Sequence, residues 1–253
     1  DYIPAVEDRT NLSMKLVVSK EKDKIGSLFN LICSLKSQSA LIFCNHRDAA
    51  ERISDTLNEK GIYATYYHGG MDQDERERAL IQFRNGSVSY LVTTDLAARG
   101  LDIPEMKHVI HYHLPSKVDE FTHRNGRTAR MNQDGISYIL NWKEDELPDF
   151  INDLEPEVIN IDNENISKLH SNLSWNTLYI SGGRRDKISK GDIAGLFFKQ
   201  GGLIKEQLGD IELKQDCAFV AVPSSIAGIL VDQLNNTRLK KKKVRVTLLE
   251  AYE

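Results

Sequence analysis

Three arginines recur at every third residue, at Arg124, Arg127 and Arg130. Residues three apart are neighbours on a helix, so this spacing predicts three guanidinium groups along one helix face. A guanidinium is permanently charged and presents a planar fork of N–H donors that fits phosphate or carboxylate oxygens. Such a face would suit a polyphosphate or a carboxylate cluster, but the spacing alone favours surface ion pairs on a solvated helix, and it is the position of the stretch in the chain that favours a binding role.

The stretch with the three arginines lies within a series of predicted strands and helices that alternate along the sequence. Short apolar runs, typical of buried parallel strands, are separated by amphipathic helical patterns such as 22–35 and 47–60. The predicted strands lie at residues 12–18, 40–44, 62–67, 90–94, 108–112 and 136–140, and a further helix is predicted over 118–130. This order predicts an α/β fold with a parallel sheet and helices on both of its faces.

Polar residues gather in the loops that follow the predicted strands. Asn45 and Arg47 follow one strand, residues 68–70 follow the next, and residues 95–102 follow the one after that. The carboxyl ends of parallel strands meet at one edge of the sheet, which is where ligands bind in such folds. We therefore expect these loops to form one functional rim.

The same stretches resemble known motifs. Residues 93–103 and 123–130 resemble motifs V and VI of the DEAD-box RNA helicases, and residues 40–45 resemble motif IV. Residues 68–76 resemble the family's His-Gly turn and its Gln-x-x-Arg motif. The resemblance implies that residues 1–160 form the second of two RecA-like domains, which together close on ATP and RNA.

The resemblance also implies an ATP site. Its residues in this chain would be Gly100, Asp102, Arg127 and Arg130. Arg127 and Arg130 would act as arginine fingers on the γ-phosphate, whose charge suits a guanidinium fork. Asp102 would accept a hydrogen bond from the ribose, with a turn or helix-capping role as the alternative. His123 and Arg124 would support the motif. Because another domain would deliver the phosphate, Arg127 and Arg130 are expected to face solvent here.

A second set of residues is implied for the RNA backbone. It consists of Asn45, Arg47, Gly69, Arg76 and Thr94. Gly69 has no Cβ and would let the sugar-phosphate chain approach closely. Contacts of this kind hold the strand without reading its sequence. For Arg76 the alternative is an ion pair with Asp72 on a helix surface.

The chain departs from the family pattern in several places. Asn125 stands where the family usually has Ile, Ala129 where it has Gly, and Gly70 where it often has Asp. The sequence also contains no GxxxxGK[ST] loop and no Asp-Glu-Ala-Asp motif. The resemblance places both in a first RecA-like domain outside this chain, which would hold Mg²⁺ against ATP. We therefore expect no metal site here, and no ATP hydrolysis or unwinding by the chain alone.

Residues 175–253 form a predicted second domain after a polar linker, 161–174. Their pattern is βαββαβ, an α+β order that resembles the RNA recognition motif. That fold stacks bases on aromatic residues of its central strands, where this chain has Tyr179 and Phe219. The aromatic consensus is poorly matched, so core packing is favoured for Phe219.

A narrower resemblance covers nearly all of residues 176–249. Residues 177–188, 191–193, 234–236 and 240–246 are similar to the RNA-binding domain of bacterial DbpA-type DEAD-box proteins. This implies binding of structured RNA, namely 23S ribosomal RNA during large-subunit assembly. The predicted contacts are Arg184, Arg185, Lys187, Lys190, Lys240, Lys241, Lys242, Lys243 and Arg245. A solvated lysine run is the alternative.

Charge and composition agree with this division. Residues 1–174 hold 20 Lys and Arg against 28 Asp and Glu, whereas residues 175–253 hold 13 against 9. A basic second domain suits a polyanion partner. Three scattered cysteines without a CxxC pair, no apolar run of eighteen residues and no signal peptide indicate a cytoplasmic protein without a membrane partner. Two alternatives remain: a non-catalytic RNA-binding or assembly protein with a degenerate RecA-like fold, and half of a DNA helicase.

Overall fold

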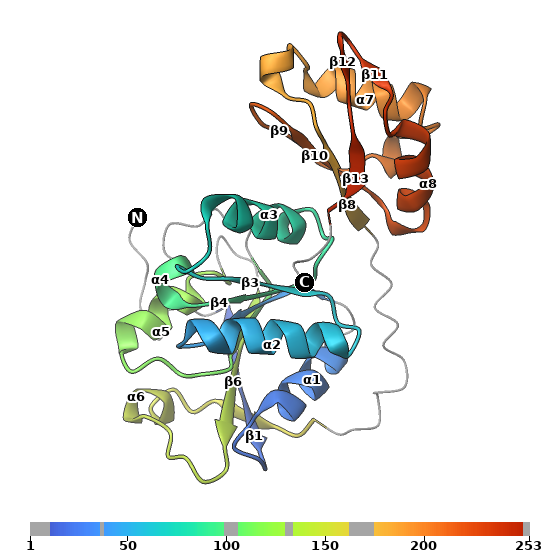
Figure 1. Cartoon of the computed structure of the whole chain (residues 1–253). Helices are drawn as coiled ribbons and strands as arrows, with labels where there is room; N and C mark the ends of the chain where they lie inside the picture. Colours follow the sequence, from blue (N-terminus) through green and yellow to red (C-terminus); the bar gives the residue numbers. More distant parts are fainter. Residues whose placement is uncertain (1–10, 36–37, 99–105, 130–133, 162–174, 250–253) are drawn as a thin grey trace. The chain divides into compact units, whose positions relative to one another are not determined.

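The computed structural model describes residues 11–35, 38–98, 106–129, 134–161 and 175–249 (Figure 1). Contacts divide the chain into two compact units, residues 1–76 with 89–171 and residues 77–88 with 172–253. The second unit therefore takes in residues 77–88, which sequence patterns assign to the first domain. Among the described residues, no helix combines the length and apolar character needed to cross a bilayer.

Parallel strands build the first part of the chain. The elements are β1 (Leu12–Ser19), α1 (Ile25–Ser34), β2 (Ala40–Phe43), α2 (Arg47–Glu59), β3 (Ala64–Tyr67), α3 (Gln73–Arg84), β4 (Tyr90–Thr93), α4 (Asp95–Ala98), β5 (His108–His111), α5 (Val118–Asn125), β6 (Gly135–Trp142), α6 (Asp149–Asn152) and β7 (Glu157–Ile159). The seven strands form one sheet in the order β3-β4-β2-β5-β6-β1-β7, and every pairing is parallel. The predicted α/β fold is confirmed.

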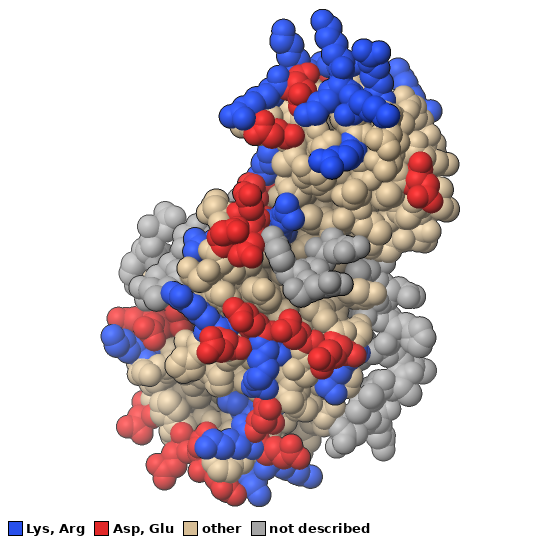
Figure 2. All heavy atoms as spheres, in the orientation of Figure 1, with Lys and Arg blue, Asp and Glu red and all other residues tan. Residues whose placement is uncertain are grey.

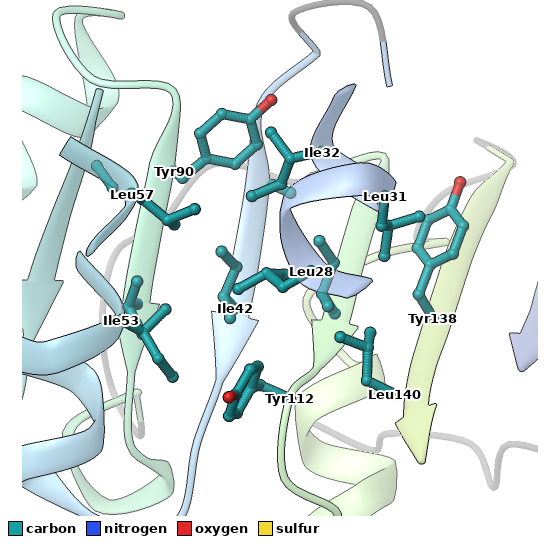
Figure 3. Packing of buried hydrophobic residues seen from close by; sticks show 14 of the residues in the cluster. Leu28, Leu31, Ile32, Ile42, Ile53, Leu57, Tyr90, Tyr112, Tyr138 and Leu140 are labelled. Carbon is teal, nitrogen blue, oxygen red and sulfur yellow. The ribbon is translucent and has the colours of Figure 1, made fainter. Parts of the chain in front are cut away.

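Both faces of this sheet are covered by helices because strand side chains alternate in direction. Leu28 of α1 and Ile53 of α2 pack against Ile42 and Leu140 on one face (Figure 3). Ile139, the neighbour of Leu140 on β6, packs on the opposite face with residues of α5 and α6. The sheet is thereby buried on both sides, and its carboxyl-terminal edge is left to carry the loops.

Helix α5 ends earlier than the sequence predicts. The predicted helix ran from 118 to 130, but α5 ends at Asn125 and the chain then turns through residues 126–129. Ala129 has a left-handed backbone with φ of 53°, which no helix can continue. Arg124 therefore lies on the helix and Arg127 lies in the turn, so the predicted face of three arginines is wrong.

The residue at the end of α5 explains one departure from the family pattern. Asn125 is fully buried, and His111 Nε2 donates to its Oδ1 at 3.1 Å. Ser137 Oγ lies at the same distance from that nitrogen. An apolar residue at 125 would remove a partner from a buried imidazole, so Asn125 belongs to a polar set that includes His111 on β5 and Ser137 on β6.

The second unit contains the predicted α+β domain. Its elements are β8 (Trp175–Ile180), a 3₁₀ turn (Arg184–Asp186), α7 (Lys190–Lys199), a second 3₁₀ turn (Lys205–Gln207), β9 (Ile211–Leu213), β10 (Ala218–Pro223), α8 (Ser224–Leu234), β11 (Arg238–Leu239), β12 (Lys242–Lys243) and β13 (Val246–Leu248). The antiparallel sheet has the order β13-β8-β10-β9, as βαββαβ predicts. The hairpin of β11 and β12 was not predicted.

Phe219 does not belong to the core between the sheet and its helices. Its neighbours on β10, Ala218 and Val220, are members of that core, so alternation places Phe219 on the opposite face. There it is buried and contacts the ring of Tyr179 edge-on, with centroids 5.8 Å apart. The burial of Phe219 agrees with the preference for packing over open-sheet stacking, although its side chain lies on the face of the sheet opposite the helices.

We expect acid to destabilise the sheet through its buried histidines. Burial lowers the pKa of His111 to about 3, and the pKa values of His108 and His113 to about 4. An unfolded chain binds these protons near pH 6.5, so below that pH protons favour the unfolded state. The free energy of unfolding should fall as pH drops from 7 to 5, and the contribution of His111 alone should approach about 1.4 kcal/mol per pH unit below pH 6.

Urea unfolding at pH 7, 6 and 5 measures this slope. The variant His111→Gln has no imidazole at the buried position, and its slope should be shallower by up to one bound proton. An unfolding free energy that stays constant over this pH range would contradict the prediction.

Candidate functional site

Arg124 is the anchor of the rim at the carboxyl ends of the strands. Its side chain is 1% exposed. Its Nε and Nη2 donate to the two carboxylate oxygens of Asp95 at 2.6 and 2.5 Å. Nη1 donates to the backbone oxygen of His113, and Nη2 donates to Asn45 Oδ1 at 2.9 Å. One guanidinium thus ties α5 to the segments that follow β2, β4 and β5.

Arg127 is held against the neighbouring loop. Its Nη2 donates to the backbone oxygen of Ala98 at 2.5 Å, and its own backbone oxygen accepts from Met106 N at 3.1 Å. The side chain is half-buried, so only part of it faces solvent as expected. The other predicted ATP-site residues, Gly100, Asp102 and Arg130, lie outside the described residues.

A narrow crevice opens beside these two arginines. Its lining combines polar side chains with the ring of Phe43 and consists of Phe43, Asp95, Ala98, Glu120, His123, Arg124 and Arg127. His123 is exposed at this crevice, whereas Arg124 is buried and its guanidinium donates to acceptors within the protein. Arg127 therefore brings a second guanidinium to the lining of the crevice, and its Nη2 donates to the backbone oxygen of Ala98.

Two further arginines flank the glycine turn that follows β3. Arg76 Nη2 donates to the backbone oxygen of Gly69 at 2.9 Å, and its buried Nε has no partner among the described residues. A Cβ added to Gly69 would lie 3.4 Å from Arg47 Nη2, so the glycine lets that guanidinium lie close to the backbone. His68, buried below, accepts from Gly70 N at 3.1 Å and lies 2.8 Å from Glu51 Oε1.

A larger open pocket of about 440 Å³ gathers most of the remaining predicted RNA residues. It is lined by Asn45, His46, Arg47, Thr94, Asp95, Pro115, Ser116 and Glu120. Arg47 connects this pocket to the glycine turn, and Asp95 and Glu120 also line the crevice of Arg127. The structure therefore brings the predicted ATP and RNA residues that it describes to one continuous rim.

Not every residue on the rim is available to a ligand. Asn45 donates from Nδ2 to the oxygen of Leu114 at 2.9 Å and accepts from Arg124, so both ends of its amide are bonded within the protein. The sequence interpretation did not single out His113, Glu120 or Ser116. Each follows or begins the segment after β5, and that position was the only indication the sequence offered.

The basic residues of the second unit also come together. Figure 2 shows Lys and Arg side chains gathered over the end of this unit that carries β11 and β12. Lys240 lies 2.7 Å from Asp192, and Lys242 lies 2.8 Å from Asp186. These pairs join residues 240–243 to residues 186–192, so two stretches that are far apart in the sequence form one surface.

Two protein-family models match the chain. The helicase conserved C-terminal domain matches residues 23–132, and the DbpA RNA binding domain matches residues 177–248. Within the first match lie the anchor of Arg124, the crevice of Arg127 and the glycine turn. Within the second lie all the basic residues predicted to contact RNA in the second unit.

Relatives match along nearly the whole chain. ATP-dependent RNA helicase DbpA of Escherichia coli is 31% identical, over 99% of this chain and 54% of that protein. The Bacillus subtilis protein of the same name is 28% identical, over 93% and 54%. The chain spans about half the length of these relatives. Among solved structures, the Escherichia coli DEAD-box protein SrmB, bound to regulator of ribonuclease activity A, is 29% identical with a TM-score of 0.56 and covers 64% of this chain and 98% of that chain.

Loss of the Arg124 anchor should be far more costly than loss of a surface pair. The variant Arg124→Met leaves the Asp95 carboxylate largely buried without its partner, and we expect a loss of about 3–5 kcal/mol in the free energy of unfolding. Arg52→Met is the matched control, because Arg52 pairs with Asp23 where both side chains are about half exposed. It should cost about 0–1 kcal/mol. Equal losses in urea unfolding would contradict the anchoring role.

Two substitutions at the turn that carries Arg127 should change its stability in opposite directions, glycine at position 129 raising it and alanine at position 135 lowering it. Ala129→Gly removes the strain of a left-handed alanine and should stabilise the unit by about 1 kcal/mol. Gly135→Ala places a Cβ 2.6 Å from Ala129 N and should cost about 1–3 kcal/mol. Gly228→Ala, where a Cβ meets nothing within 4 Å, is the control. Thermal unfolding of all three variants tests both signs.

Proposed function

The chain belongs to the DbpA-like DEAD-box RNA helicases, and from this premise we propose that it serves an ATP-dependent enzyme that remodels structured RNA. The supporting observation is the single rim on which Arg127, the glycine turn with Arg47 and Arg76, and the open pocket lie side by side. Guanidinium groups and backbone amides at such an edge suit phosphates of both a nucleotide and a nucleic-acid strand.

In this proposal, Arg127 and Arg130 bind the γ-phosphate of ATP, and Asp102 with Gly100 contacts the nucleoside. Arg127 is already oriented by its bond to Ala98, which lowers the entropy lost when it meets a phosphate. ATP and Mg²⁺ would be held mainly by a first RecA-like domain of the whole protein. Bound Mg²⁺ would supply charge neutralisation of the phosphates. The residues of this chain would add positive charge where it develops during transfer.

The open pocket and the glycine turn would hold the RNA backbone. Arg47 and Arg76 offer guanidinium donors on either side of Gly69, and the buried Nε of Arg76 still needs an acceptor. Thr94 lines the same pocket, and Asn45 would act by fixing its wall. None of these groups reads a base edge, so we expect little sequence preference from this unit.

The second unit would supply the preference for a structured RNA. We propose that its basic surface binds a hairpin of 23S ribosomal RNA during large-subunit assembly in the cytoplasm. The similarity to the DbpA RNA binding domain and the positive charge of residues 175–253 support this. Tethering by this unit would raise the effective concentration of nearby duplex at the rim.

Removal of the proposed fingers should abolish catalysis and spare RNA binding. In the whole enzyme, Arg127→Ala with Arg130→Ala should lower RNA-stimulated ATP hydrolysis by about 10³-fold or more, the effect of arginine fingers in related enzymes. Lys60→Ala, at the far end of α2, removes a cation outside the rim and should leave the rate within twofold. A double variant that hydrolyses ATP at nearly the wild-type rate would contradict the assignment.

The isolated chain of 253 residues provides the complementary measurement. It should bind a ribosomal RNA hairpin and release no phosphate from ATP, because its sequence has no phosphate-binding GxxxxGK[ST] loop. Equal displacement of the hairpin by single-stranded DNA would favour half of a DNA helicase. A whole protein that binds RNA without hydrolysing ATP would favour the non-catalytic alternative.

A further inference from the structure

The hairpin of β11 and β12 has two chemically different faces. Leu239 pairs with Lys242 across the hairpin, and Arg238 pairs with Lys243. Leu239 is buried in the core of the unit and Lys242 is half-buried, so this pair faces the domain. Arg238 and Lys243 are exposed, so their side chains face outward.

The outward pair places two cations directly opposite each other. Like charges in this arrangement destabilise a hairpin unless an anion lies between or above them. Among the residues that the structure describes, no ion pair is recorded for Arg238, Lys243 or the neighbouring Lys241 of the turn. The opposed cations therefore leave an unsatisfied requirement for negative charge on this face.

The inward side of the hairpin is fastened to the loop before α7. Lys242 Nζ lies 2.8 Å from Asp186 Oδ2, which also accepts from Gly183 N at 3.1 Å. Lys240 Nζ lies 2.7 Å from Asp192 and donates to the backbone oxygen of Lys187 at 2.5 Å. Two lysines of a run of four are thus paired with carboxylates that also cap local turns.

The backbone of Lys240 adopts a conformation that is unfavourable for a lysine. Its φ is 55°, a left-handed conformation that favours glycine or asparagine in a hairpin turn. A lysine at this position gives up that backbone preference. It gains the two contacts of its ammonium group, which hold the hairpin against residues 187 and 192.

We propose that the hairpin is a phosphate clamp for the RNA backbone, in which Arg238 and Lys243 bind phosphates while Lys240 and Lys242 are positioning residues. This inference rests on the proposed RNA-binding function and divides its basic residues into two classes. Arg238, which sequence motifs did not single out, joins the contacts. Lys240 and Lys242, predicted as contacts, instead hold the hairpin against Asp192 and Asp186, and we call these two ion pairs the latch.

The division follows from which charges are already compensated. A lysine whose ammonium lies 2.8 Å from a carboxylate must give up that partner before it can serve a phosphate equally well. Arg238 and Lys243 give up no such partner, and a fastened hairpin loses little freedom when it binds. Counterion release from two such contacts would make binding fall as salt rises.

The contact pair can be tested with a charge-matched control. In the 253-residue chain, Arg238→Gln with Lys243→Gln should weaken binding of a 23S-derived RNA hairpin. It should also reduce the slope of log affinity against log salt by about 1.5, since each phosphate contributes about 0.7–0.9. Lys199→Gln with Lys205→Gln removes the same charge from the other end of α7 and should change the slope by less than half as much. Equal effects of the two pairs would overturn the proposal.

The role of Lys242 is tested by whether Asp186→Asn weakens or strengthens RNA binding. Asp186→Asn keeps an acceptor for Gly183 N and frees the ammonium of Lys242. If Lys242 positions the hairpin, both Asp186→Asn and Lys242→Gln weaken RNA binding and leave the salt slope unchanged. If Lys242 instead contacts phosphate, Asp186→Asn strengthens binding, Lys242→Gln lowers the slope, and the assignment is overturned. Circular dichroism melting of each variant, matched to wild type, establishes that the domain is folded.

These outcomes separate the clamp from the proposed function. If the wild-type chain binds the hairpin with no dependence on salt, or does not bind it, the proposed RNA-binding function fails. If wild type binds with a steep salt dependence and the Arg238 and Lys243 variant behaves like its control, the clamp alone fails.

Discussion

The buried ion pair of Arg124 and Asp95 is the constraint on which the rim depends. A guanidinium keeps its charge in proteins, so burying one at 1% exposure destabilises the fold unless its N–H groups find acceptors. Here Nε, Nη1 and Nη2 donate to oxygens of Asp95, His113 and Asn45 on the rim. Those oxygens belong to segments that follow three strands. The ends of β2, β4 and β5 are therefore held together by one side chain from α5. The functional loops begin from fixed positions because this charge must be satisfied.

The same constraint gives the arginines of the motif different tasks. Arg124 spends its donors inside the protein, whereas Arg127 lies beyond the end of α5 and reaches the crevice from a turn. That turn requires a left-handed residue at 129 and close approach of the chain at Gly135. A continuous helix would have kept both guanidinium groups on neighbouring turns. The break in the helix separates Arg124, which anchors the rim, from Arg127, which reaches the crevice.

Much of the fold follows from the sequence because its signals are local. Apolar runs such as residues 40–43 and the spacing of strands and helices predict the parallel sheet, and βαββαβ predicts the second sheet order. Other features depend on partners distant in sequence. The end of α5 at Asn125 depends on contacts with β5 and β6, and the hairpin depends on Asp186 and Asp192, about fifty residues away. The spacing of residues along the sequence carries no information about side-chain pairs that are distant in it. The roles of Arg124 and Lys242 could therefore not be separated from those of their neighbours.

Both units use cations that are paired with carboxylates to fix the backbone. Arg124 pairs with Asp95 and Lys242 pairs with Asp186, whereas Lys243, next to Lys242, has no ion pair among the residues that the structure describes. Arg124 is desolvated together with Asp95 in the folded protein and has little to gain from a phosphate. The pair of Lys242 is more exposed, and its role is to fix the hairpin. A cation such as Lys243, which has no ion pair among the described residues, retains most of its attraction for a phosphate. In a basic stretch, some cations are already paired with carboxylates of the protein. The remaining cations are the better candidates for binding a phosphate, so the pairing identifies them more sharply than the number of positive charges does.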